Sequence, residues 1–68
     1  MLLYLVVAEG TDPSTATQLA VANGCCGFYT GIPPVWMAQA AEQGWTLPCV
    51  LTDDGTGSIV AWSPVAPA

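Results

Sequence analysis

The sequence predicts a small α/β (α+β) domain, a two-layer sandwich with the element order β-α-α-β-β. Three observations predict this fold class. The chain opens with LLYLVVA at residues 2–8, an apolar run typical of a strand that is covered on both faces. Its middle carries two stretches with helix start and stop signals. Its last third has the pattern of a hairpin, because TLPCVLT and SIVAWS flank the turn-forming DDGTG.

The first helix is predicted within GTDPSTATQLAVANG, residues 10–24. Asp12 can cap the free backbone N–H groups of the first turn, and Pro13 suits the first helical position. Gly24 fits the left-handed position just past a helix end. The apolar stripe of this helix is shallow and made of small residues. It comprises Ala16, Leu19, Ala20 and Asn23.

The second helix is predicted within GIPPVWMAQAAEQG, residues 31–44. A proline pair opens it, and Gly44 lies where it ends. Its apolar face is predicted to carry Trp36, Met37, Ala40 and Ala41, opposite a polar face of Gln39, Glu42 and Gln43.

The predicted sheet has three strands, including the C-terminal hairpin, with both short helices on one face. The other face would then expose apolar side chains to water, and an apolar patch of that kind usually marks a contact with a protein or a membrane. One domain is expected over residues 1–63, followed by a loose proline-rich tail at residues 64–68. The exposed set is drawn from Leu2, Tyr4, Val6, Val50, Val60 and Trp62.

The stretch NGCCGFYTG, residues 23–31, is predicted to be a tight connection between the two helices. Its cysteines have neither a Cys-x-x-Cys spacing nor a basic neighbour, and zinc sites need four paired ligands. We therefore expect Cys25, Cys26 and Cys49 to be free thiols that pack as small hydrophobes. A structural disulfide from Cys25 or Cys26 to Cys49 is the main alternative, and a thiol- or metal-dependent protein is a further one.

The charge inventory excludes several function classes. The chain has five acidic residues and no Lys, Arg or His. Nucleic-acid binding relies on cationic side chains that neutralise phosphates, so none is expected. Without His or Lys there is no ordinary base near neutral pH, and we expect neither enzyme activity nor a bound cofactor or metal. Asp53 and Asp54 lack the further ligands of a calcium loop and are expected to form the hairpin turn.

The longest apolar run ends at Glu9, far short of the ~20 residues that span a bilayer as a helix. It also lacks the basic region that opens a signal peptide. We therefore expect no membrane span and a cytoplasmic or virion location.

The leading functional hypothesis is a non-enzymatic structural or interaction subunit that buries an apolar face against a protein partner or in a homo-oligomer. A small virion component, such as a capsid-decorating or cement protein, fits this physical character. The alternative is a small acidic inhibitor that occupies a basic site on a partner. Tryptophan and tyrosine are enriched at binding hot spots. The partner-binding residues predicted on these grounds are Tyr4, Phe28, Tyr29, Trp36, Val60 and Trp62.

Overall fold

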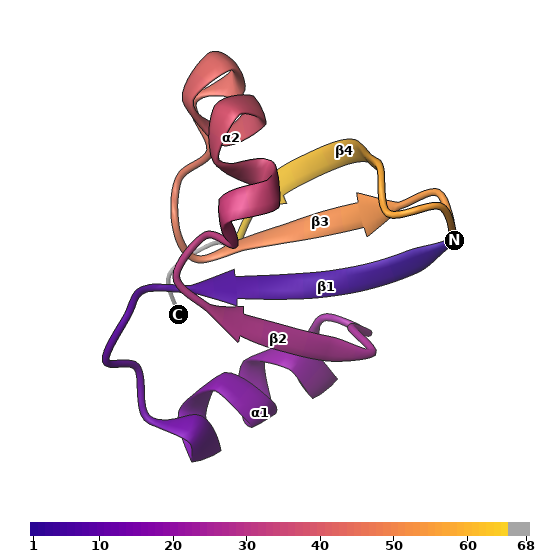
Figure 1. The fold of residues 1–68 in the computed structure, drawn as a ribbon. Helices are drawn as coiled ribbons and strands as arrows, with labels where there is room; N and C mark the ends of the chain where they lie inside the picture. The colour runs from indigo at the N-terminus through magenta and orange to yellow at the C-terminus, as the bar shows by residue number, and fades with distance from the viewer. Residues whose placement is uncertain (66–68) are drawn as a thin grey trace.

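The computed structural model describes residues 1–65 and contains four strands, two α-helices and one 3₁₀ turn (Figure 1). The elements follow one another as β1 (Leu2–Val7), α1 (Pro13–Ala22), β2 (Gly27–Thr30), η1 (Pro34–Trp36), α2 (Met37–Gln43), β3 (Cys49–Asp53) and β4 (Ile59–Pro64).

The four strands form one mixed sheet in the order β2-β1-β3-β4. β1 pairs in parallel with β2 on one side and antiparallel with β3 on the other, and β3 pairs antiparallel with β4. The predicted class, a small α+β domain with two helices and a C-terminal hairpin, is confirmed. The predicted count of three strands is wrong, and β1 lies inside the sheet rather than at its edge.

The additional strand is β2, which occupies the segment predicted to be a helix–helix connection. It returns parallel to β1 because α1 acts as the crossover that two parallel strands require. Two flanking backbone hydrogen bonds extend the pairing, from Cys26 N–H to Leu3 O at 2.8 Å and from Gly31 N–H to Val7 O at 2.7 Å. Phe28, Tyr29 and Thr30, the three residues between Gly27 and Gly31, are too short a run to show strand alternation in the sequence.

Side chains of β1 alternate between two covered faces of the sheet. Leu5 and Val7 pack with Ala16 and Ala20 of α1 on one face. Val6 packs on the other face, in a cluster that includes Trp36 of η1 and Ala40 of α2. Figure 1 shows α1 and α2 on different sides of the sheet.

The prediction of two helices on one face is therefore wrong. Three consecutive buried residues in β1 require a cover on each face, and one helix supplies each cover. Val6 and Val50, which were predicted among the candidates for an exposed sheet face, are buried.

α1 forms as the sequence predicts. The Asp12 carboxylate accepts hydrogen bonds from the backbone N–H groups of Ser14 at 3.1 Å and Thr15 at 3.3 Å. Gly24, just past the helix end, adopts a φ of 69°, which is the left-handed conformation that favours glycine. Of the predicted stripe, Ala16 and Ala20 are buried, and these small residues let the helix approach the sheet closely.

α2 is anchored to the β3–β4 hairpin by two side-chain donors. The Trp36 indole N–H donates to Gly57 O at 3.2 Å, and the Gln39 amide donates to Ile59 O at 2.9 Å. Trp36 and Ala40 of the predicted apolar face are buried, whereas Met37 and Ala41 are exposed. The buried stripe is narrow: Trp36 and Ala40 are four residues apart and share one face, whereas Met37 and Ala41 each follow by one residue and lie on the adjacent, exposed face.

The turn between β3 and β4 uses both aspartates, as predicted. The buried Asp53 carboxylate accepts the backbone N–H groups of Gly55 at 2.7 Å and Gly57 at 3.1 Å. Asp54 accepts the backbone N–H and the hydroxyl of Thr56 at 2.8 and 2.6 Å. Those hydrogen bonds to Thr56 hold the pKa of the Asp54 carboxyl below its usual value.

The predicted boundary after residue 63 falls within β4, which extends to Pro64. Val65 N–H donates to Pro48 O at 2.9 Å, and the Val65 side chain packs against the cluster that contains α1. The rest of the predicted tail, residues 66–68, lies outside the described residues.

The close packing of α1 gives a stability prediction. Ala16→Leu adds volume at a position with 0% exposure and should destabilise the fold by about 1–3 kcal/mol. The matched control Ala22→Leu makes the same change at an exposed position of the same helix and should stay within about 0.5 kcal/mol of the parent. Denaturant unfolding measures both variants. Equal stabilities would contradict the placement of Ala16 against the sheet.

Candidate functional site

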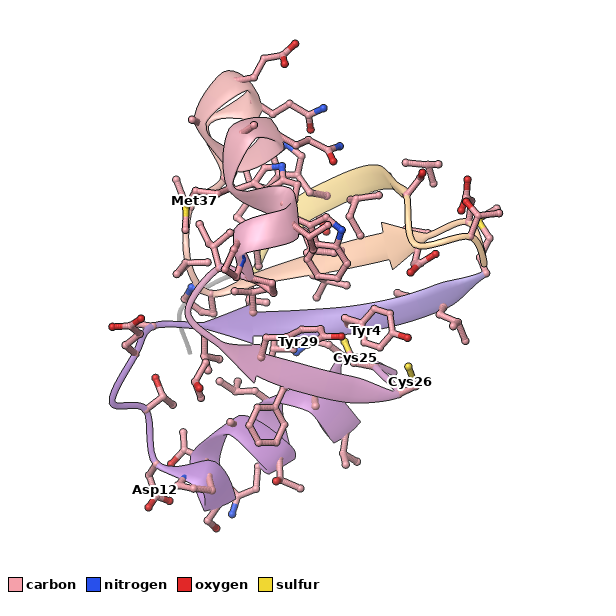
Figure 2. All side chains as sticks on the ribbon, viewed as in Figure 1. Tyr4, Asp12, Cys25, Cys26, Tyr29 and Met37 are labelled. Atoms are coloured by element: carbon pink, nitrogen blue, oxygen red, sulfur yellow. The ribbon has the colours of Figure 1, made fainter. Side chains whose placement is uncertain are left out.

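The structure brings together three of the six predicted partner-binding residues. Tyr4 of β1, Tyr29 of β2 and Trp36 of η1 form an aromatic cluster on the α2 side of the sheet, where Figure 2 labels the two tyrosines. The ring centroids of Tyr4 and Tyr29 are 5.6 Å apart, and those of Tyr29 and Trp36 are 5.4 Å apart in an edge-to-face arrangement. Within this cluster Trp36 is buried, whereas Tyr29 is 38% exposed.

The other three predicted residues lie elsewhere. Phe28 is half-buried and packs with α1 on the opposite face of the sheet. Trp62 of β4 is half-buried against the cluster beneath α2, and Val60 of β4 is exposed. The six residues therefore do not form one surface.

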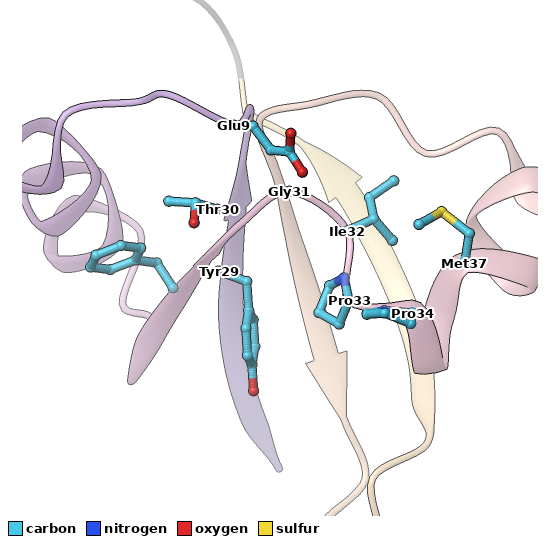
Figure 3. Close-up of a pocket in the computed structure, with 9 residues that line it drawn as sticks. Glu9, Tyr29, Thr30, Gly31, Ile32, Pro33, Pro34 and Met37 are labelled. Atoms are coloured by element: carbon cyan, nitrogen blue, oxygen red, sulfur yellow. The ribbon is translucent and has the colours of Figure 1, made fainter.

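A shallow groove of about 530 Å³ runs beside the exposed part of the aromatic cluster (Figure 3). We call it the β2 groove. Residues 28–34 line it together with Glu9 and Met37. Figure 3 shows Tyr29 on the β2 side of the groove, with Pro33, Pro34 and Met37 on the side of η1 and α2.

The lining places this groove along the outer edge of the sheet. Side chains of a strand alternate between its two faces, so Phe28 and Thr30 project to the α1 side and Tyr29 to the α2 side. All three residues line the same groove. A hollow that reaches both sides of β2 must pass over the strand's outer edge.

The Glu9 side chain lies close to Gly31 at the end of β2. Gly31 has a φ of 83°, and a Cβ atom at this position would lie only 2.8 Å from Glu9 Cγ and 3.0 Å from Glu9 Oε1. A larger residue at position 31 would clash with Glu9 at these distances. Gly31 therefore allows the Glu9 side chain to lie against the end of β2. The groove is otherwise lined by aromatic, proline, aliphatic and thioether groups, with one threonine hydroxyl.

The five acidic side chains lie in separate parts of the fold. Asp12 caps α1, Glu42 belongs to α2, and Asp53 and Asp54 form the hairpin turn, while Glu9 lines the groove. Within residues 1–65, no three His, Cys, Asp or Glu side chains are grouped as metal ligands would be.

The three thiols are all free in the described part of the chain. The prediction that they pack as small hydrophobes agrees with Cys25 and Cys49 but is wrong for Cys26, which is exposed. Their surroundings differ. Cys26 is exposed near Tyr4, Cys25 is half-buried on the α1 side, and Cys49 has 0% exposure (Figure 2). Burial raises the pKa of Cys25 and of Cys49, and the nearby Cys26 thiol adds to the rise at Cys25. Burial and the neighbouring Cys26 thiol likewise raise the pKa of the Tyr4 hydroxyl.

Sequence reasoning missed most of the groove. Glu9, Ile32, Pro33, Pro34 and Met37 were not predicted as binding residues. Met37 was assigned to a buried helix face. The proline pair was available as a signal, because Pro33 keeps the chain extended after β2 and Pro34 begins η1, and both prolines line the groove.

Comparison with known proteins gives no match to a protein-family model, to a curated protein or to a solved structure. As for membrane association, the helices in residues 1–65 are too short or too polar to cross a bilayer.

The thiol surroundings give a reactivity prediction. Iodoacetamide at pH 8 should alkylate the exposed Cys26 first, Cys25 more slowly, and Cys49 only after denaturation. Because the thiolate is the reactive species and the Cys25 pKa is raised, the Cys25 rate should keep rising as the pH goes above 9. Peptide mass mapping of each site measures the order. Rapid labelling of Cys49 in the folded protein would contradict its burial.

Proposed function

We propose that this chain is a non-enzymatic interaction subunit that binds a protein partner through the β2 groove and the exposed side chains beside it. In this role the small domain is one component of a larger assembly, and its affinity comes mainly from apolar contact.

One observation carries the proposal. Seven large apolar side chains are exposed in residues 1–65, and three of them, Tyr29, Val35 and Met37, fall within residues 29–37. Tyr29 and Met37 line the groove, and Val35 lies between the groove residue Pro34 and the buried Trp36. The remaining four are distributed over the N-terminus, α1 and β4. Exposed apolar residues concentrated around a groove mark a contact surface more than scattered ones do.

The side-chain types suit binding. Tyr29 offers a large, rigid contact area with few rotatable bonds, and Met37 adapts its shape to a partner. Proline rings add apolar surface that loses little conformational entropy on binding. Glu9 has no acid or base beside it among the lining residues, which favours a binding role over an acid–base reaction.

The positions of the acidic side chains favour a structural subunit over an acidic inhibitor. An inhibitor that imitates a polyanion needs an array of free carboxylates, whereas Asp12, Asp53 and Asp54 accept hydrogen bonds within their own turns, and Glu9 and Glu42 lie apart from them. A capsid-decorating protein is a more specific version of this proposal, because such proteins act by covering the surface of a larger assembly.

Site-specific photo-crosslinking tests the proposed surface. A benzoylphenylalanine residue replaces Val35 in one variant and Val21 of α1 in the control, and the two positions are 79% and 74% exposed. In the native host we expect a discrete crosslinked species at position 35 and none at position 21. The product is read by immunoblot and identified by mass spectrometry.

A product with another protein or with a second copy of the chain would support an interaction subunit. Equal, diffuse labelling at both positions, or no product at position 35, would contradict the proposal.

A further inference from the structure

We propose that the occupant of the β2 groove is an extended, basic segment of a partner protein, which adds to the sheet as a strand beside β2. This inference rests on the proposed function and specifies the chemistry of the partner.

The outer edge of β2 is available for strand addition. β2 is the last strand on its side of the sheet in the described chain. Gly31 N–H bonds to Val7 O of β1. In a parallel ladder every second residue bonds to the same neighbour, so Tyr29 and Gly27 also face β1. Phe28 and Thr30 therefore direct their backbone N–H and C=O groups away from β1, where an extended peptide can pair with them.

β2 is also less protected than the opposite edge strand. Natural edge strands are usually shielded from pairing by charged residues, proline or a bulge. β4 carries a register shift opposite Thr52 and Asp53 and ends in Pro64. β2 has the sequence GFYT, with no charge and no proline, and its register with β1 is regular.

The groove adds side-chain recognition to this backbone edge. A strand added to β2 would lie about 4.8 Å from it, within the volume that the groove provides. Side chains of that strand on the α2 side would contact Tyr29, Pro33 and Met37. Apolar residues at every second position of the partner segment suit this surface.

The charge of the groove indicates that the partner segment is basic. Glu9 is the charged side chain among the residues that line the groove, and the chain has no Lys, Arg or His. A second copy of this chain would bring five more acids and no cationic side chain to Glu9. A segment with Lys or Arg near the end of β2 would be complementary, so a basic partner is favoured over self-association.

The test uses synthetic octapeptides that alternate valine or tyrosine with lysine, and a matched set in which glutamate replaces lysine. Fluorescence polarisation measures Kd for the full chain. The lysine set should bind, and the glutamate set should bind at least about 10-fold more weakly. Sedimentation of the peptide-free protein reports whether a second copy competes for the edge.

N-methylation of the peptide backbone tests strand addition without changing the protein. Methyl groups at the positions that bond to β2 should weaken binding about 10-fold or more, whereas methyl groups at the alternate positions should have little effect. A pattern with a period of two identifies an added strand. The absence of any such pattern would overturn strand addition.

A pair of variants tests the role of Glu9. Glu9→Gln should weaken binding of the lysine peptides about 2–5-fold and reduce its salt dependence. Glu42→Gln changes the net charge equally on α2, outside the groove, and should leave Kd unchanged. Equal effects of the two variants would overturn a specific ion pair at Glu9.

The failure of this inference is distinguishable from the failure of the proposed function. If position 35 crosslinks to a partner while the lysine peptides do not bind, the inference falls and the proposed function stands. If the free protein self-associates through β2, a second copy is the occupant and the basic partner is overturned.

Discussion

The burial of three consecutive residues in β1 is the constraint on which the rest of the structure depends. Leu5, Val6 and Val7 have 0–2% exposure, and in a strand their side chains must point to alternate faces. A sheet whose central strand is apolar on both sides needs a cover on both sides. In a chain of 68 residues, this demand leaves one short helix for each face.

The two faces of the sheet are covered with different kinds of side chain. α1 lies over β1 and β2 with alanines, so its contact is close but contributes little apolar area. The α2 side fills a larger space with Trp36 and Trp45, which flank the helix rather than belong to it, and the Trp36 indole is fixed by its hydrogen bond to the hairpin. Tyr4 and Tyr29 fill the space between α2 and the β2 edge, where the cover is incomplete. The proposed binding surface therefore lies between the edge strand β2 and the start of α2.

The sequence allowed correct prediction of those elements whose ends carry local signals. Asp12, Pro13 and Gly24 define α1, Gly44 ends α2, and the aspartates and glycines of residues 53–57 make the hairpin turn. These signals act within a few residues, so they can be recognised without knowledge of the tertiary structure.

The features that were missed depend on contacts between distant residues. β2 is a strand because α1 returns it beside β1, and nothing within GFYT indicates that pairing. Whether two helices share a face is likewise decided by the strand order and not by either helix. The candidate site was anticipated only through its aromatic residues Tyr4, Tyr29 and Trp36, because the groove arises from where β2 ends and the proline pair begins.

Amide hydrogen exchange along residues 26–31 tests most directly the claim that β2 is a parallel edge strand with an open outer side. In the peptide-free protein, the amides of Cys26 and Gly31 should be protected, because they bond to Leu3 and Val7. The amides of Phe28 and Thr30, which face away from β1, should exchange rapidly. NMR measures each amide separately. Rapid exchange at all six residues would mean that the segment is a connection rather than a strand, and protection of Phe28 and Thr30 would mean that the edge is already covered. Either result would contradict this account.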